Sequence, residues 1–116
     1  MNILVPKRIL VVENDPSLCE LLRVVLLSEG HQVEEAHDGW QALAKLDQKK
    51  FDVVFADPSI PEMQTDVADS RPKVGSDPTP VVKIAGFSTA VGLEATSLFT
   101  INPFDLSSIR EALAAI

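Results

Sequence analysis

Acidic residues end two of the apolar segments of this chain. Glu13 closes the run RILVVE, and Asp57 closes the run FDVVFAD. Asn14 and Asp15 follow Glu13 directly, which places three polar side chains at one segment end. Neighbouring carboxylates repel one another unless a cation lies between them, and Mg²⁺ binds proteins through one or two carboxylates while keeping several waters. The sequence therefore predicts a candidate magnesium site, provided that the two segment ends meet.

Short apolar runs alternate with helical patterns along the chain. We expect strands at residues 8–13, 31–36, 51–57, 80–86 and 98–101, where apolar and β-branched side chains are concentrated. Helical patterns follow the first, second and fifth of these runs, and such alternation favours a parallel sheet covered by helices on both faces. In a sheet of this kind, ligands bind at the carboxyl ends of the strands, so Glu13 and Asp57 are expected at one crevice.

Helix signals support this order of elements. Asp15 is a favourable N-cap with Pro16 at the first helical position, and Gly30 is a natural stop for the same helix. Asp105 is expected to cap the last helix. We therefore interpret Asp15 as a helix cap rather than as a metal ligand.

Two helical positions are weak. Residues 64–79 contain two prolines and a glycine, and residues 87–97 are interrupted by Gly92. Proline and glycine in a helix interior are unfavourable, so the third and fourth helices are expected to be shortened.

Composition narrows the class of protein. The 116 residues suit one domain, residues 1–116, and no apolar stretch is long enough to span a membrane, so a cytoplasmic location is expected. The net charge of −7 disfavours nucleic-acid binding through this domain. Cys19 is interpreted as a reduced, half-buried thiol, and His31 and His37 as surface residues flanking a strand.

Four motifs match one known family in order and spacing: VVENDP at residues 11–16, DGWQAL at 38–43, Asp57 with Pro61, and NPFD at 102–105. On these motifs the chain, from Lys7 to Ile116, resembles the receiver domain of bacterial two-component response regulators. The resemblance implies a flavodoxin-like (CheY-like), doubly wound α/β fold with a five-stranded parallel sheet in the order 2-1-3-4-5.

The resemblance also implies roles for particular residues. Asp57 corresponds to the phosphoacceptor, which takes a phosphoryl group from a sensor histidine kinase, another signalling protein or a small phosphodonor. Glu13, Asp57 and the backbone carbonyl of Ser59 correspond to the Mg²⁺ ligands. Phe99 corresponds to the aromatic residue whose rotamer follows activation. Domains of this kind are signalling modules, so we do not expect an enzyme.

Three positions depart from the family pattern. Asn14 replaces the second acid, which should weaken Mg²⁺ binding unless Asp15 turns inward to compensate. Ala85 replaces the hydroxyl residue at the end of the fourth strand, although a shifted alignment would offer Ser88 or Thr89. Asn102 replaces the lysine before the Pro-Phe pair. These departures predict an atypical receiver with impaired switching; the alternative is a protein-interaction module that works without phosphorylation.

Two other classes are disfavoured. An aspartate-nucleophile phosphatase would carry a second acid two residues after Asp57, where this chain has Ser59. A flavodoxin-type cofactor site would need a glycine-rich phosphate loop after the first strand, and none is present in the sequence.

Overall fold

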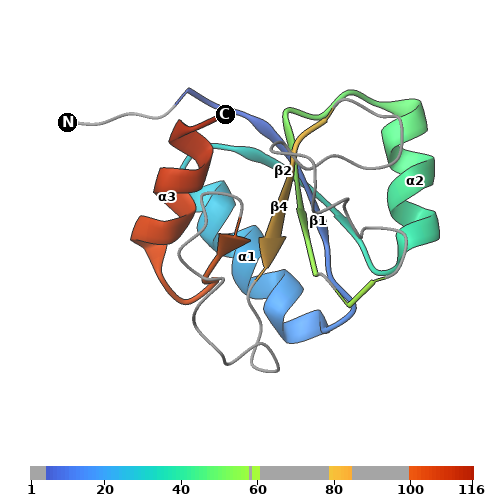
Figure 1. Ribbon diagram of the computed structural model, residues 1–116, viewed down its shortest axis with the longest axis horizontal. Helices are drawn as coiled ribbons and strands as arrows, with labels where there is room; N and C mark the ends of the chain where they lie inside the picture. The colour runs from blue at the N-terminus through green and yellow to red at the C-terminus, as the bar shows by residue number, and fades with distance from the viewer. Residues whose placement is uncertain (1–4, 58, 61–78, 85–99) are drawn as a thin grey trace.

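The protein folds as a parallel β-sheet with helices on both faces. The computed structural model describes residues 5–57, 59–60, 79–84 and 100–116. In chain order the elements are β1 (Arg8–Val12), α1 (Pro16–Ser28), β2 (Gln32–Ala36), α2 (Gly39–Gln48), β3 (Val53–Ala56), β4 (Val81–Ile84), β5 (Thr100–Ile101) and α3 (Leu106–Ala114) (Figure 1). The predicted α/β class is confirmed.

The sheet has the order β2-β1-β3-β4-β5, and every adjacent pair is parallel. Because all strands run the same way, their carboxyl ends lie along one edge of the sheet. Val12, the last residue of β1, is in register with Ala36 of β2 on one side and with Ala56 of β3 on the other. Of the run expected at residues 98–101, the structure describes the two residues of β5, which pair with β4.

The core forms two clusters, one on each face of the sheet. On β1, Ile9 and Val11 belong to the cluster shared with α1 and α3, whereas Leu10 and Val12 belong to the cluster on the side of α2. Figure 1 shows the same arrangement, with α1 and α3 on one side of the strands and α2 on the other. All four side chains are fully buried, which explains why β1 is a continuous apolar run rather than an alternating one.

The start of α1 is the one expected from the sequence. The Asp15 carboxylate accepts hydrogen bonds from the backbone N–H groups of Ser17 at 3.0 Å and Leu18 at 3.4 Å, and Pro16 is the first helical residue. Two of the N–H groups that a helix start leaves unpaired are thereby satisfied. Asp105 caps α3 in the same way, through a 3.0 Å bond from the Ser107 N–H.

The end of α1 corrects one expectation. Gly30 has a positive φ of 93°, and the N–H groups of Gly30 and His31 donate back to Leu27 at 3.0 Å and Leu26 at 3.1 Å. This pattern is a Schellman motif, whose last residue commonly packs against the helix it closes. His31 occupies that place and is buried, so its interpretation as a surface residue was wrong; His37 is exposed.

Buried His31 also joins two segments. Its Nδ1 atom accepts a 3.0 Å hydrogen bond from the backbone N–H of Lys7, so the neutral ring carries its proton on Nε2. Burial lowers the pKa of His31 below its ordinary value of 6.5.

Cys19 is also more deeply buried than the sequence suggested. Its side chain is only 1% exposed, rather than half-buried, within the cluster shared with α1 and α3. Burial raises the pKa of this thiol to about 12, with a smaller contribution from the negative charge of Glu35. A thiol in this state is a core side chain and not a nucleophile.

The helices predicted within residues 64–79 and 87–97 fall almost wholly outside the described residues. Across the part of the chain that the structure describes, no helix has the length and apolar character needed to cross a membrane.

Candidate functional site

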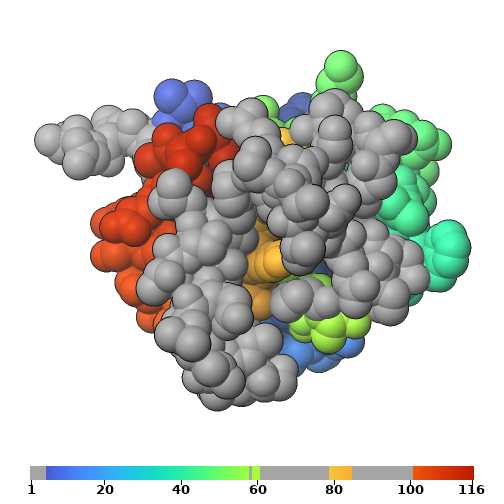
Figure 2. All heavy atoms as spheres, in the orientation of Figure 1, coloured from blue at the N-terminus to red at the C-terminus, as the bar shows by residue number. Residues whose placement is uncertain are grey.

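Glu13 and Asp57 leave adjacent strands at the same edge of the sheet. The Asp57 N–H donates to the carbonyl of Val12 at 3.0 Å, which ties the end of β3 to the end of β1. On the other side, the Glu13 N–H donates to the carbonyl of Ala36 at 3.0 Å. In Figure 2 the yellow-green atoms just after β3 lie against blue atoms of the N-terminal part of the chain. The structure therefore brings these two predicted site residues together.

Glu13 is a buried carboxylic acid. Its side chain is 1% exposed, and its Oε2 atom accepts a 3.1 Å hydrogen bond from the Asp15 N–H. Its Oε1 atom is buried and has no hydrogen-bond partner among the described residues. Burial, followed by the interaction with the Asp57 carboxyl, raises the pKa of Glu13 to about 7. Two ionised carboxylates at this point are thus disfavoured unless a cation joins them.

Asp57 is more accessible than Glu13. Its side chain is half-buried, and its Oδ1 atom accepts a 2.9 Å hydrogen bond from the Ser59 N–H. The Ile60 N–H donates to the Asp57 carbonyl at 3.1 Å, and the Ile60 side chain is buried. These bonds hold the Asp57 carboxylate at the carboxyl edge of the sheet.

The two residues after Glu13 point elsewhere. Asn14 is exposed, and Asp15 uses its carboxylate at the start of α1. Asp15 therefore acts as the predicted cap, and the inward rotation that would compensate for Asn14 is not the observed conformation. Of these three residues, Glu13 is the one whose carboxyl group interacts with Asp57.

Asn102 is held within its own turn. Its Oδ1 atom accepts a 2.9 Å hydrogen bond from the Phe104 N–H, and its own N–H donates to Ser108 Oγ at 3.0 Å. The Asp105 N–H donates to the Asn102 carbonyl at 3.0 Å. The side chain is exposed and stabilises the connection between β5 and α3.

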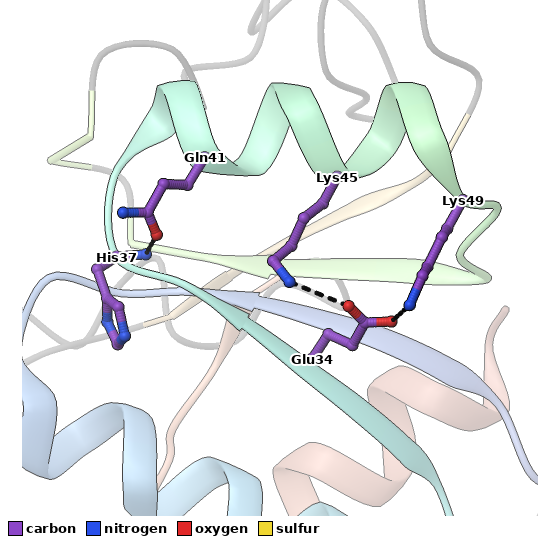
Figure 3. Close-up of polar contacts among 5 residues, drawn as sticks. All are labelled: Glu34, His37, Gln41, Lys45 and Lys49. Atoms are coloured by element: carbon purple, nitrogen blue, oxygen red, sulfur yellow. Dashed lines mark hydrogen bonds and ion pairs between the residues drawn. The ribbon is translucent and has the colours of Figure 1, made fainter.

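Polar side chains of α2, and that of Lys49 directly after it, contact β2 and the residue that follows β2. The Gln41 side chain accepts a 3.0 Å hydrogen bond from the His37 N–H, while Lys45 and Lys49 contact the two carboxylate oxygens of Glu34 at 3.0 and 2.7 Å (Figure 3). Gln41 and Lys45 are spaced i, i+4 on one face of α2, and Lys49 follows four residues later as the C-cap of that helix. Sequence analysis missed this network, although that spacing was the available signal.

Several predicted site residues lie outside the described residues, namely Ala85, Phe99, and the alternatives Ser88 and Thr89. Within the described ranges, no group of three or more His, Cys, Asp or Glu side chains could hold a metal ion. The magnesium site expected from the sequence needs only the two carboxylates of Glu13 and Asp57 and the Ser59 carbonyl. An unpartnered buried carboxylate oxygen next to a second carboxylate fits the hard-oxygen preference of Mg²⁺.

The parallel sheet in the order β2-β1-β3-β4-β5, with Glu13 and Asp57 at its carboxyl edge, is a doubly wound α/β fold of the flavodoxin-like class. The family model described as the response regulator receiver domain matches residues 9–94, and the chain belongs to this family. The resemblance stated from the sequence motifs is thereby confirmed.

Similar transcriptional regulatory proteins support this assignment. The chain is 34% identical over 110 residues to the transcriptional regulatory protein ZraR of Salmonella typhimurium, covering 90% of this chain and 25% of that protein. It is 41% identical over 58 residues to the transcriptional regulatory protein TrcR of Mycobacterium tuberculosis, covering 50% of this chain and 23% of that protein. The chain thus spans about a quarter of the length of these relatives.

Solved structures support the fold. A receiver domain from Methylobacillus flagellatus matches with a TM-score of 0.66 and 22% identity, covering 96% of this chain and 98% of that one. The chemotaxis response regulator CheY4 of Vibrio cholerae matches with a TM-score of 0.63 at the same identity and coverage. The predicted flavodoxin-like (CheY-like) architecture is confirmed by these similarities.

Proposed function

We propose that this receiver domain accepts a phosphoryl group on Asp57, with Mg²⁺ held by Glu13, Asp57 and the Ser59 carbonyl. An Asp57 oxygen attacks the phosphorus of a phosphorylated histidine, the P–N bond breaks, and its electron pair goes to the imidazole nitrogen. The product is an acyl phosphate on Asp57. The metal would neutralise the charge of the transferring phosphoryl group.

One observation carries this proposal: a fully buried Glu13 carboxyl interacts with the half-buried Asp57 carboxyl, and the buried Oε1 atom of Glu13 has no hydrogen-bond partner among the described residues. Burying an ionised carboxylate is costly without a compensating partner. A divalent cation supplies that partner, and it also binds the oxygens of an incoming phosphoryl group. The pair is thus suited to phosphoryl transfer rather than to a structural hydrogen bond alone.

The phosphodonor in this proposal is a sensor histidine kinase or another signalling protein. The domain acts as the acceptor and switch, not as an enzyme. The transcriptional regulators that it resembles are longer proteins, and we propose that this domain likewise controls a partner or an attached output part. Contact with nucleic acid through the domain itself is disfavoured by the net charge of −7. A cytoplasmic location is part of the same proposal.

We further propose that phosphorylation switches this domain weakly. Phosphorylation shifts a two-state equilibrium only through contacts that differ between the states. Asn102 cannot neutralise the phosphoryl charge, and its oxygen is already bonded to the Phe104 N–H. Loss of one charge-assisted hydrogen bond costs about 1.5–3 kcal/mol. Ala85 has no hydroxyl group to offer, which removes a second contact.

The test is covalent labelling. The purified chain is incubated with acetyl phosphate and Mg²⁺, and its intact mass is followed. We expect one added phosphoryl group, its loss in Asp57→Asn, and its loss when EDTA replaces Mg²⁺. Asp52→Asn is a matched control, because Asp52 lies just before β3 at its opposite end and is exposed.

Two results would contradict the proposal. Equal labelling of the Asp57→Asn variant would place the acceptor elsewhere. Absence of any labelling would instead favour the phosphorylation-independent interaction module, and unchanged signalling by Asp57→Ala in the parent organism would support that alternative.

A further inference from the structure

A cavity of about 330 Å³ opens at the end of the sheet opposite to Asp57. Its lining comes from the beginnings of β1 and β2, the residue after α2 and the segment before β3: Arg8, Gln32, Val33, Glu34, Lys49 and Phe51. Five strand residues of β1 separate this end from Glu13, a distance of about 16 Å at the usual rise of a strand. The cavity is therefore separate from the proposed phosphoryl site.

The lining combines an apolar surface with hydrogen-bond donors. Phe51 is half-buried and packs on the α2 face of the sheet, whereas the Val33 side chain packs on the α1 and α3 face. Arg8 and Gln32 are register partners on adjacent strands, and the Arg8 Nε–H donates to the Gln32 side-chain oxygen at 3.2 Å. That bond orients the guanidinium group and uses one of its five N–H donors. The remaining donors of Arg8 and the amide donors of Gln32 are the groups available to a ligand.

The charges at this cavity favour an anion. Both oxygens of the one lining carboxylate, Glu34, are already contacted by ammonium groups, those of Lys45 and Lys49. These contacts lower the pKa of Glu34, so it stays ionised and paired. The nearby Asp52 carboxylate is not part of the lining and accepts the Arg8 backbone N–H at 2.8 Å. The lining side chains thus carry two cations, Arg8 and Lys49, and one anion, Glu34, which Lys45 from outside the lining also contacts.

The size of the cavity limits the ligand to a small molecule. Small-molecule sites typically measure about 300–1,000 Å³, are mostly apolar, and carry a few placed polar groups. This cavity lies at the lower end of that range. A guanidinium fork binds a carboxylate with two parallel hydrogen bonds, which is its most specific geometry.

We propose that this cavity binds a small carboxylate with an apolar ring or branched chain. The carboxylate pairs with the terminal nitrogens of Arg8 and receives support from Lys49, while the apolar part covers Phe51. The ligand bridges β1, β2 and the end of α2, so it gives the domain a second input that is independent of phosphorylation at Asp57.

The test is a titration of the ¹⁵N-labelled chain with benzoate, followed by ¹H–¹⁵N NMR. We expect saturable shifts centred on the backbone amides of Val33, Glu34 and Phe51, with a dissociation constant of about 1 mM or below. Benzyl alcohol has the ring without the charge, and acetate has the charge without the ring. Both should bind at least about tenfold more weakly, since each lacks one half of the recognition.

Variants make the test specific. Arg8→Gln should weaken benzoate binding by about tenfold or more, because a charge-assisted pair is lost. Lys49→Gln should weaken it less, because Lys49 is shared with Glu34. Arg23→Gln is the matched control, since this arginine lies on α1 and pairs with Glu35. Its benzoate affinity should equal that of the wild type.

Three results would overturn the proposal. These are shifts that do not saturate and spread over the surface, an Arg8→Gln variant that keeps both its fold and wild-type affinity, and saturable shifts centred on the backbone amides of Glu13 and Ser59 instead. The last result would place benzoate at the phosphoryl site. If Arg8→Gln is phosphorylated at the wild-type rate, the phosphoryl site does not depend on the cavity. The two proposals are then tested independently of each other.

Discussion

Replacing Glu13 by glutamine is expected to stabilise the metal-free domain at pH 8. The pKa of Glu13 is raised from its ordinary value of 4.5 to about 7 in the folded state, mainly by burial. At about 1.4 kcal/mol for each pKa unit, ionised Glu13 destabilises the fold by about 3 kcal/mol. Glutamine carries no charge, and its side-chain oxygen can still accept the hydrogen bond from the Asp15 N–H.

The sign of the pH dependence follows from the same shift. As the pH rises above 4.5 the unfolded chain loses its Glu13 proton first, so the wild type loses stability until the pH passes about 7. The advantage of Glu13→Gln is therefore complete at pH 8 and shrinks as the pH is lowered towards 4.5. Saturating Mg²⁺ should reverse the order, because the cation stabilises the folded wild type by binding to it.

The assay is urea unfolding in EDTA at pH 8 and pH 5.5, repeated at pH 8 with Mg²⁺. With a urea dependence of about 2 kcal/mol per molar, the variant's midpoint should rise by about 1.5 M at pH 8. Glu20→Gln is the control, because that side chain is 71% exposed on α1. A variant that is less stable than the wild type in EDTA at pH 8, or an advantage that does not depend on pH, would refute the reasoning.

Three further predictions concern single residues. Asn14→Asp should tighten Mg²⁺ binding by about tenfold, or about 1.4 kcal/mol, because it restores a carboxylate beside the metal; calorimetric titration with unchanged affinity would contradict this. Asp15→Ala should cost about 1 kcal/mol of stability through loss of the α1 cap while leaving Mg²⁺ affinity within about twofold of the wild type, and a large loss of affinity would make Asp15 a ligand after all. In a Glu13→Gln background, stability should fall as the pH drops below 6.5. The reason is that His31 is protonated near pH 6.5 in the unfolded chain, whereas burial lowers its pKa in the folded state. His31→Gln should flatten that dependence in unfolding experiments, and an equal slope in both proteins would exclude His31 as its source.

Local signals along the chain predicted the framework well. Asp15 and Asp105 each cap a helix as expected, since a cap depends on residues within one turn. The apolar run at residues 9–12 indicated burial on both faces, and β1 does lie between two strands and two helical layers. These features follow from sequence patterns because neighbours in the chain are also the neighbours in space.

Burial that arises from distant contacts was less predictable. His31 was expected at the surface because a polar residue beside a strand is usually solvated. It is buried because the turn at Gly30 directs it inward, where it meets Lys7 from another segment. Glu13 was expected near Asp57, but its complete burial depends on the packing of strands that the sequence does not place in three dimensions.

The turn at Asn102 has a consequence for how this domain can respond. Its amide oxygen, its N–H and its carbonyl are all engaged within the connection from β5 to α3. A lysine there would regain a mobile cation but would give up the side-chain acceptor that fastens the Phe104 N–H. The same position can thus provide either a rigid link or a charge that follows the phosphoryl group, and this chain has the rigid link.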